Sequence, residues 1–102
     1  MDRIAALTEI LAENPNDEFA RYGLAMEYSK AGEVDRAMEE FGKLLAANPN
    51  YTPGYFMAAQ MLAATGRTDE AKKMLIDGIG SARRTGNAHA QSEMTAMLEE
   101  LR

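Results

Sequence analysis

The sequence of 102 residues has no cysteine, one histidine, three prolines and no long apolar run. Without cysteine, a disulfide framework, a thiolate metal site and a cysteine nucleophile are all excluded. No segment approaches the roughly 18 apolar residues that are needed to span a bilayer. The first residues include Asp2 and Glu9 and do not resemble a signal peptide. We expect a cytoplasmic protein with no membrane as a partner.

Strand patterns are absent as well, because the chain has few β-branched residues and no alternating apolar run. This absence favours an all-α fold. The formal net charge of −5 argues against nucleic acid as the main partner, since nucleic acid attracts a positive field. The acidic excess lies in residues 1–51, which hold ten acidic and five basic side chains.

An internal repeat is present. Asn14-Pro15-Asn16 recurs 34 residues later as Asn48-Pro49-Asn50. The same shift places small or turn-forming residues on one another, namely Ala25 on Ala59, Gly32 on Gly66, Asp35 on Asp69 and Ala37 on Ala71. A fixed period of this length is typical of helical repeat arrays.

Apolar spacing predicts six helices, at residues 2–13, 17–30, 34–47, 52–65, 69–84 and 88–101. Asn16 or Asp17 is expected to cap the second helix, and Thr52 to cap the fourth. Gly32 and Gly66 are expected to end the second and fourth helices with positive φ.

The fifth predicted helix contains two glycines, Gly78 and Gly80. Each is less favourable in a helix than alanine by about 1 kcal/mol. We therefore expect a close packing contact or a mild bend at this point.

The spacing of large, small and turn residues resembles the tetratricopeptide repeat (TPR) family. The matching residues in the first unit are Leu24, Ala25, Tyr28, Gly32, Ala37, Phe41 and Pro49, and those in the second are Tyr55, Ala59, Leu62, Gly66, Ala71 and Leu75. Two positions depart from the family pattern: Arg21 stands where a large aromatic residue is usual, and Arg83 where a closing proline is expected.

The resemblance implies one all-α domain over residues 1–102, built from antiparallel helix–turn–helix units that stack into a right-handed superhelix. Residues 2–13 would form an N-terminal half-repeat helix and residues 88–101 a capping helix. Repeat 1 would cover residues 17–50 and repeat 2 residues 51–84. The terminal helices would shield the exposed ends of the array.

Catalysis finds little support in the sequence. His89 and Glu93 share one helix face, but two ligands are too few for zinc. Gly78-Ile79-Gly80 is a fragment of a phosphate-binding loop, but it lies inside a predicted helix and lacks the following Lys-Ser/Thr. We expect no catalytic residue, no metal and no cofactor.

The first helix of each predicted unit carries two stripes at three- and four-residue spacing. One is a packing stripe, of Leu24, Ala25 and Tyr28 in the first unit and of Tyr55, Ala58, Ala59 and Leu62 in the second. In the resembled family the first helices line the concave side, where partner peptides lie. The resemblance thus implies a partner-binding groove made by the second stripes: Phe19, Tyr22, Met26, Ser29, Phe56, Gln60 and Ala63.

Family members that grip a C-terminal carboxylate use Lys, Asn and Arg on this wall. The equivalent positions here hold Tyr22, Met26, Phe56 and Gln60. A carboxylate clamp is therefore not indicated, and the groove should be apolar and aromatic, with Gln60 as its polar group. The expected function is non-catalytic binding of a peptide or helix of a protein partner.

Three alternatives remain open at this point. The first or last helix can cover the second stripes, which would then belong to the core. The same apolar residues, or a terminal helix, can join two copies into a homodimer. A basic group of Arg67, Lys72, Lys73, Arg83 and Arg84 can contact an acidic partner or simply be solvated.

Overall fold

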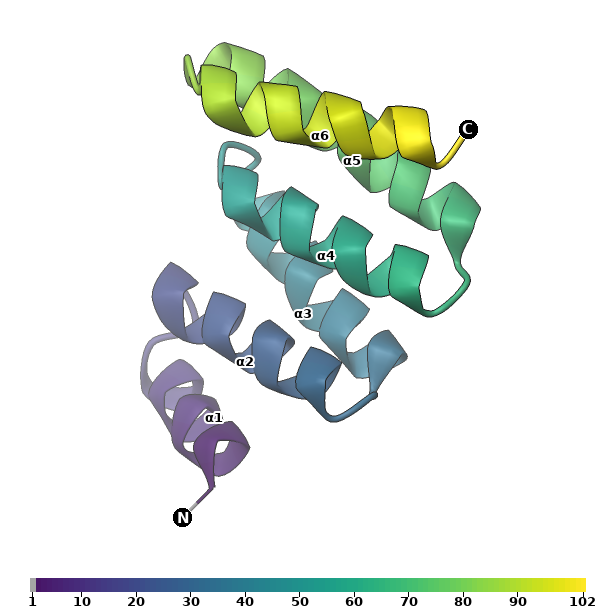
Figure 1. The fold of residues 1–102 in the computed structure, drawn as a ribbon. Helices are drawn as coiled ribbons and strands as arrows, with labels where there is room; N and C mark the ends of the chain where they lie inside the picture. Colours follow the sequence, from purple (N-terminus) through teal and green to yellow (C-terminus); the bar gives the residue numbers. More distant parts are fainter. Residues whose placement is uncertain (1) are drawn as a thin grey trace. The chain divides into compact units, whose positions relative to one another are not determined.

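The computed structural model describes residues 2–102 and contains six α-helices, with no strand in that range. The helices are α1 (Arg3–Glu13), α2 (Glu18–Lys30), α3 (Val34–Ala47), α4 (Thr52–Ala64), α5 (Thr68–Arg84) and α6 (Ala88–Glu100), as Figure 1 shows. The predicted all-α class is confirmed, and every helix begins and ends within one residue of its prediction. None of the helices described is both long and apolar enough to cross a bilayer.

The chain divides into two compact units between Ala47 and Asn48. In the first unit α2 packs against both α1 and α3. In the second unit α5 packs against both α4 and α6. The assignment of residues 17–50 and 51–84 to two repeats within one domain stays a prediction.

Three helices end in the same glycine turn. Gly32, Gly66 and Gly86 have φ values of 77°, 82° and 68°, in the left-handed region that glycine adopts without strain. After α2, the Glu33 amide donates to the Tyr28 carbonyl and the Gly32 amide to the Ser29 carbonyl. The turns after α4 and α5 repeat this pair of bonds, which satisfies carbonyls at the end of each helix.

The two Asn-Pro-Asn segments fold alike. The Asn16 amide donates to Asn14 Oδ1 at 3.2 Å, and the Asn50 amide donates to Asn48 Oδ1 at 3.0 Å. These side chains stand in for a backbone turn, and the proline that follows each first asparagine stops the preceding helix. The repeated tripeptide therefore makes the same connection before α2 and before α4.

The α2 cap is as predicted, but the α4 cap is not. Asp17 accepts a hydrogen bond from the Ala20 amide and caps α2. The prediction for Thr52 is wrong, because Thr52 is the first residue inside α4 and Tyr51 is the N-cap, without a side-chain cap bond. The buried Thr52 hydroxyl instead lies 2.8 Å from the Ser81 hydroxyl, so it joins α4 to α5.

Gly78 is a point of close approach between helices in the second unit. A Cβ at this position would lie 2.6 Å from Met94 Sδ on α6 and 2.7 Å from Tyr55 Cβ on α4. Only a glycine lets the three helices come this close. The expected close contact is therefore confirmed at Gly78, whereas at Gly80 the nearest atom is the Arg84 guanidinium, at 3.5 Å.

Candidate functional site

The two stripes of helix α4 differ in burial. All four residues of the packing stripe are buried: Tyr55, Ala58, Ala59 and Leu62. In the second stripe Phe56 and Ala63 are half-buried, and Gln60 is exposed. One face of α4 therefore builds the core, while the neighbouring face stays accessible within its own unit.

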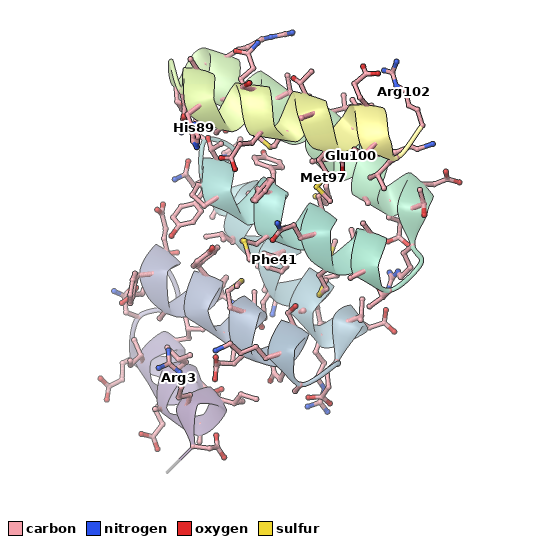
Figure 2. The ribbon with its side chains drawn as sticks, in the orientation of Figure 1. Arg3, Phe41, His89, Met97, Glu100 and Arg102 are labelled. Atoms are coloured by element: carbon pink, nitrogen blue, oxygen red, sulfur yellow. The ribbon has the colours of Figure 1, made fainter. Side chains whose placement is uncertain are left out.

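Phe56 and Gln60 line an open hollow of about 380 Å³ in the second unit. The remaining lining comes from α6, namely Glu93, Ala96, Met97 and Glu100. Figure 2 shows Met97 extending from α6 toward α4, with Glu100 beside it. The last helix therefore covers part of the stripe and adds two carboxylates to the apolar surface that was predicted.

Sequence reasoning left open whether the last helix covers the stripe and did not predict which residues of α6 line the hollow, although a signal was present. The N-caps of α2, α4 and α6 are Asp17, Tyr51 and Asn87, so the interval from α4 to α6 is two residues longer than the 34-residue repeat period. The 34-residue shift cannot align α6 for this reason. Counted from the N-caps, Ala96 occupies the position of Met26 and Gln60.

In the first unit, the residues of the predicted stripe on α2 differ in solvent exposure. Phe19 is 80% exposed, whereas Tyr22, Met26 and Ser29 are half-buried. The Tyr22 ring packs edge-on against Phe41 of α3, with ring centroids 6.5 Å apart. Tyr22 is therefore held in a fixed orientation, while Phe19 contributes little to the core.

The departure at Arg21 has a structural explanation. Arg21 Nη2 donates to the Pro15 carbonyl at 3.0 Å, and at the matching place in the second unit the Tyr55 hydroxyl donates to the Pro49 carbonyl at 2.9 Å. Arg21 Nη1 also lies 2.6 Å from Oε2 of the buried Glu40. Arg21 therefore supports the turn at Pro15, as Tyr55 supports the corresponding turn at Pro49 in the second unit.

One of the predicted basic residues has a role inside its own unit. Arg84 Nε donates to Asn50 Oδ1 at 2.9 Å, and Nη2 donates to the Pro49 carbonyl at 3.0 Å. Lys72 is half-buried, and Lys73 and Arg83 are exposed. A partner contact at these residues stays a prediction.

His89 and Glu93 form a surface pair on α6. His89 Nε2 lies 2.9 Å from Glu93 Oε1, and both side chains are exposed. Residues 2–102 contain no group of three or more His, Cys, Asp or Glu side chains that could hold a metal ion.

Comparison with known proteins agrees with this architecture. The model of the tetratricopeptide repeat family matches residues 4–57 and, in a second overlapping placement, residues 28–92. A TPR repeat-containing protein of Pseudomonas aeruginosa is 29% identical over 98 residues, which cover 96% of this chain and 93% of the relative.

Solved structures show the same fold. A tetratricopeptide repeat domain protein from Salinibacter ruber, solved by NMR, has a TM-score of 0.78 and 31% identity, and the match covers 86% of this chain and 89% of that one. The TPR2B domain of yeast Sti1, solved in complex with pHsp70, has a TM-score of 0.85 at 18% identity, covering 96% and 78%. Since the family model matches more than half of the sequence, this chain belongs to the tetratricopeptide repeat family.

Proposed function

We propose that this chain binds an apolar segment of a protein partner, either a peptide or a helix, against the second stripes of α2 and α4. Tetratricopeptide repeats are a general protein-interaction module, and the family is typically non-catalytic. The proposal assigns the contact in the second unit to Phe56, Gln60 and Ala63. It assigns the contact in the first unit to Phe19, Tyr22, Met26 and Ser29.

One observation carries the proposal. On α4 the packing stripe is buried, while Phe56 and Gln60 on the adjacent stripe line an open hollow. A half-buried aromatic ring beside a methionine offers a large contact area and a surface that adapts in shape. Aromatic residues and methionine are enriched in protein interfaces relative to the rest of the surface.

The hollow suits a side chain of a partner better than an enclosed small molecule. Small-molecule sites bury most of their ligand in a cleft, whereas this hollow is open to solvent. The TPR2B domain of yeast Sti1, which shares the fold, was solved with a pHsp70 partner. That precedent supports a macromolecular partner and does not identify it.

Site-specific photocrosslinking in cells that express the protein tests the proposal. A photoreactive residue replaces Gln60, which lines the hollow, or Ile76, which is 60% exposed on α5 and does not line it. We expect a heterologous protein to be crosslinked from position 60 and not from position 76. Adding Phe56→Ala should remove the product while circular dichroism remains unchanged.

Two results would contradict the proposal. Equal products from positions 60 and 76 would show non-specific contact. A product that consists only of two copies of this chain, together with a dimer in light scattering that Phe56→Ala dissociates, would establish self-association as the use of this surface.

A further inference from the structure

The hollow between α4 and α6 combines an apolar floor with negative charge at its edge. Phe56, Ala96 and Met97 supply the apolar surface. Glu93 and Glu100 supply two carboxylates, and Gln60 is the only other polar side chain in the lining. No lysine or arginine lines the hollow.

The two carboxylates mark the ends of the hollow along α6. They are seven residues apart, which corresponds to about 10 Å along a helix axis. Glu93 is paired with the exposed His89. For Glu100, no ion pair forms with any residue in the range 2–102.

Glu100 is also unfavourably placed for the stability of its own helix. It is the last residue of α6, whose last turn contains no basic residue. The C-terminal end of a helix carries partial negative charge and favours cations. A carboxylate at this position therefore strengthens a negative potential that a cation from outside α6 can neutralise.

We propose that this hollow binds a partner segment in which one large apolar side chain lies between two basic residues. The apolar side chain contacts Phe56 and Met97, and the two cationic groups face Glu93 and Glu100. This inference rests on the proposed function and defines the chemistry of the partner at the same site. The partner is thus a cationic peptide segment. Its charge is opposite to that of a peptide that is bound through its C-terminal carboxylate.

An extended segment can present such a pattern on one face. In an extended chain alternate side chains point the same way, so residues i, i+2 and i+4 share one face. The first and last of these are about 13 Å apart along the backbone. Long, flexible basic side chains at these two positions can bend inward to reach carboxylates that are about 10 Å apart. The expected pattern is a basic residue, any residue, a large apolar residue, any residue and a second basic residue.

Fluorescence anisotropy with a labelled peptide tests the pattern. The probe is Ala-Lys-Ala-Phe-Ala-Lys-Ala with blocked ends, and three further peptides carry Gln for both Lys, Glu for both Lys, or Ala for Phe. We expect the Lys–Phe–Lys peptide to bind most tightly. The Gln peptide should bind about tenfold more weakly, and the binding of the Lys peptide should weaken as salt increases.

Variants of the protein locate the contact. Glu93→Gln and Glu100→Gln should each weaken binding of the Lys peptide by about threefold, as expected for exposed charge pairs. Glu99→Gln is the matched control, because Glu99 has the same charge on the same turn but does not line the hollow. The double variant Glu93→Lys/Glu100→Lys should reverse the preference and favour the Glu peptide.

The outcomes separate the inference from the proposed function. If the Lys and Gln peptides bind equally, and Phe56→Ala weakens both, the apolar site stands and the inference about charge is wrong. An equal effect of Glu99→Gln and Glu100→Gln would also overturn the inference. If no peptide binds, or if the Ala-for-Phe peptide binds as well as the probe, the hollow is not the binding site and both ideas fail.

Discussion

At the scale of single residues, Arg21 and Tyr55 perform the same task with different chemistry. Each donates a hydrogen bond to the carbonyl of the proline six residues earlier, Pro15 or Pro49. The sequence predicted only that Arg21 departs from the family pattern. It could not predict the bond to Glu40, because the two residues lie on different helices and the pairing depends on how α2 and α3 pack.

Removing Arg21 should destabilise the protein, because Glu40 would remain as a buried carboxylate with only the longer 3.9 Å contact to Lys43. For Arg21→Ala we expect a loss of about 2 kcal/mol in the free energy of unfolding, since the pair retains slight exposure. Urea denaturation followed by circular dichroism measures this loss.

The second unit provides the matched control for that variant. The residues that correspond to Arg21 and Glu40 are Tyr55 and Met74. The double variant Arg21→Tyr/Glu40→Met should regain most of the lost stability, because the tyrosine hydroxyl can donate to Pro15 and no charge is buried. A double variant as unstable as Arg21→Ala would contradict the equivalence of the two positions.

Gly78→Ala should destabilise the protein although alanine is the better helix former. The added Cβ would overlap Met94 Sδ and the stiff Cβ of Tyr55, so α4 or α6 must shift. We expect a loss of about 1 to 3 kcal/mol in the free energy of unfolding, as for other overpacked cores. Thermal and urea denaturation measure it.

Gly42→Ala is the control for this substitution. Gly42 is also inside a helix, but nothing lies within 4 Å of an added Cβ. This variant should gain about 0.5 to 1 kcal/mol from helix propensity. A similar gain in Gly78→Ala would show that the three helices are not in close contact at Gly78.

At the scale of secondary-structure elements, local chemistry determined what could be predicted. Asn-Pro-Asn and glycine act within a few residues of the helix ends that they define, so the bounds of the six helices followed from the sequence. The Thr52 cap was wrong because Ser81, 29 residues away, offers the hydroxyl a buried partner. The part of the hollow on α6 was missed because its register differs from the repeat period.

Arg84, the last residue of α5, forms hydrogen bonds to the connection that precedes α4. Arg84→Met removes the bonds to Asn50 and to the Pro49 carbonyl while keeping a long side chain, so we expect a loss of about 1 kcal/mol. Arg83→Met removes the same charge from an exposed neighbour and should change stability by less than about 0.5 kcal/mol. Equal effects in urea denaturation would mean that the Arg84 bonds contribute nothing beyond charge.

At the scale of the whole molecule, each helix packs within its own unit on the helices next to it in sequence. Stability in such proteins is close to a sum of local terms, and terminal elements have the fewest contacts. Helix α1 illustrates this, because its only buried residue is Leu11, which packs with Ala20 and Leu24 of α2. Helix α5 contributes six buried residues and lies between α4 and α6.

Native-state hydrogen exchange should therefore differ between these helices. We expect amides of α1 to exchange through local opening of low free energy, and those of α5 to require the largest opening of the second unit. Exchange followed by mass spectrometry or NMR resolves the two. Equal protection of α1 and α5 would contradict additive, neighbour-based stability.

The positions of Met94 and Met97 on α6 predict that oxidants attack the two methionines at different rates. Met94 is fully buried beside Gly78, whereas Met97 is half-buried on the floor of the hollow. Mild peroxide should therefore convert Met97 to its sulfoxide well before Met94, as peptide mass spectrometry can follow.

A sulfoxide at Met97 would make the floor of the hollow polar, so peptide binding should fall on oxidation and return after treatment with methionine sulfoxide reductases. A Met97→Leu variant should keep its affinity throughout.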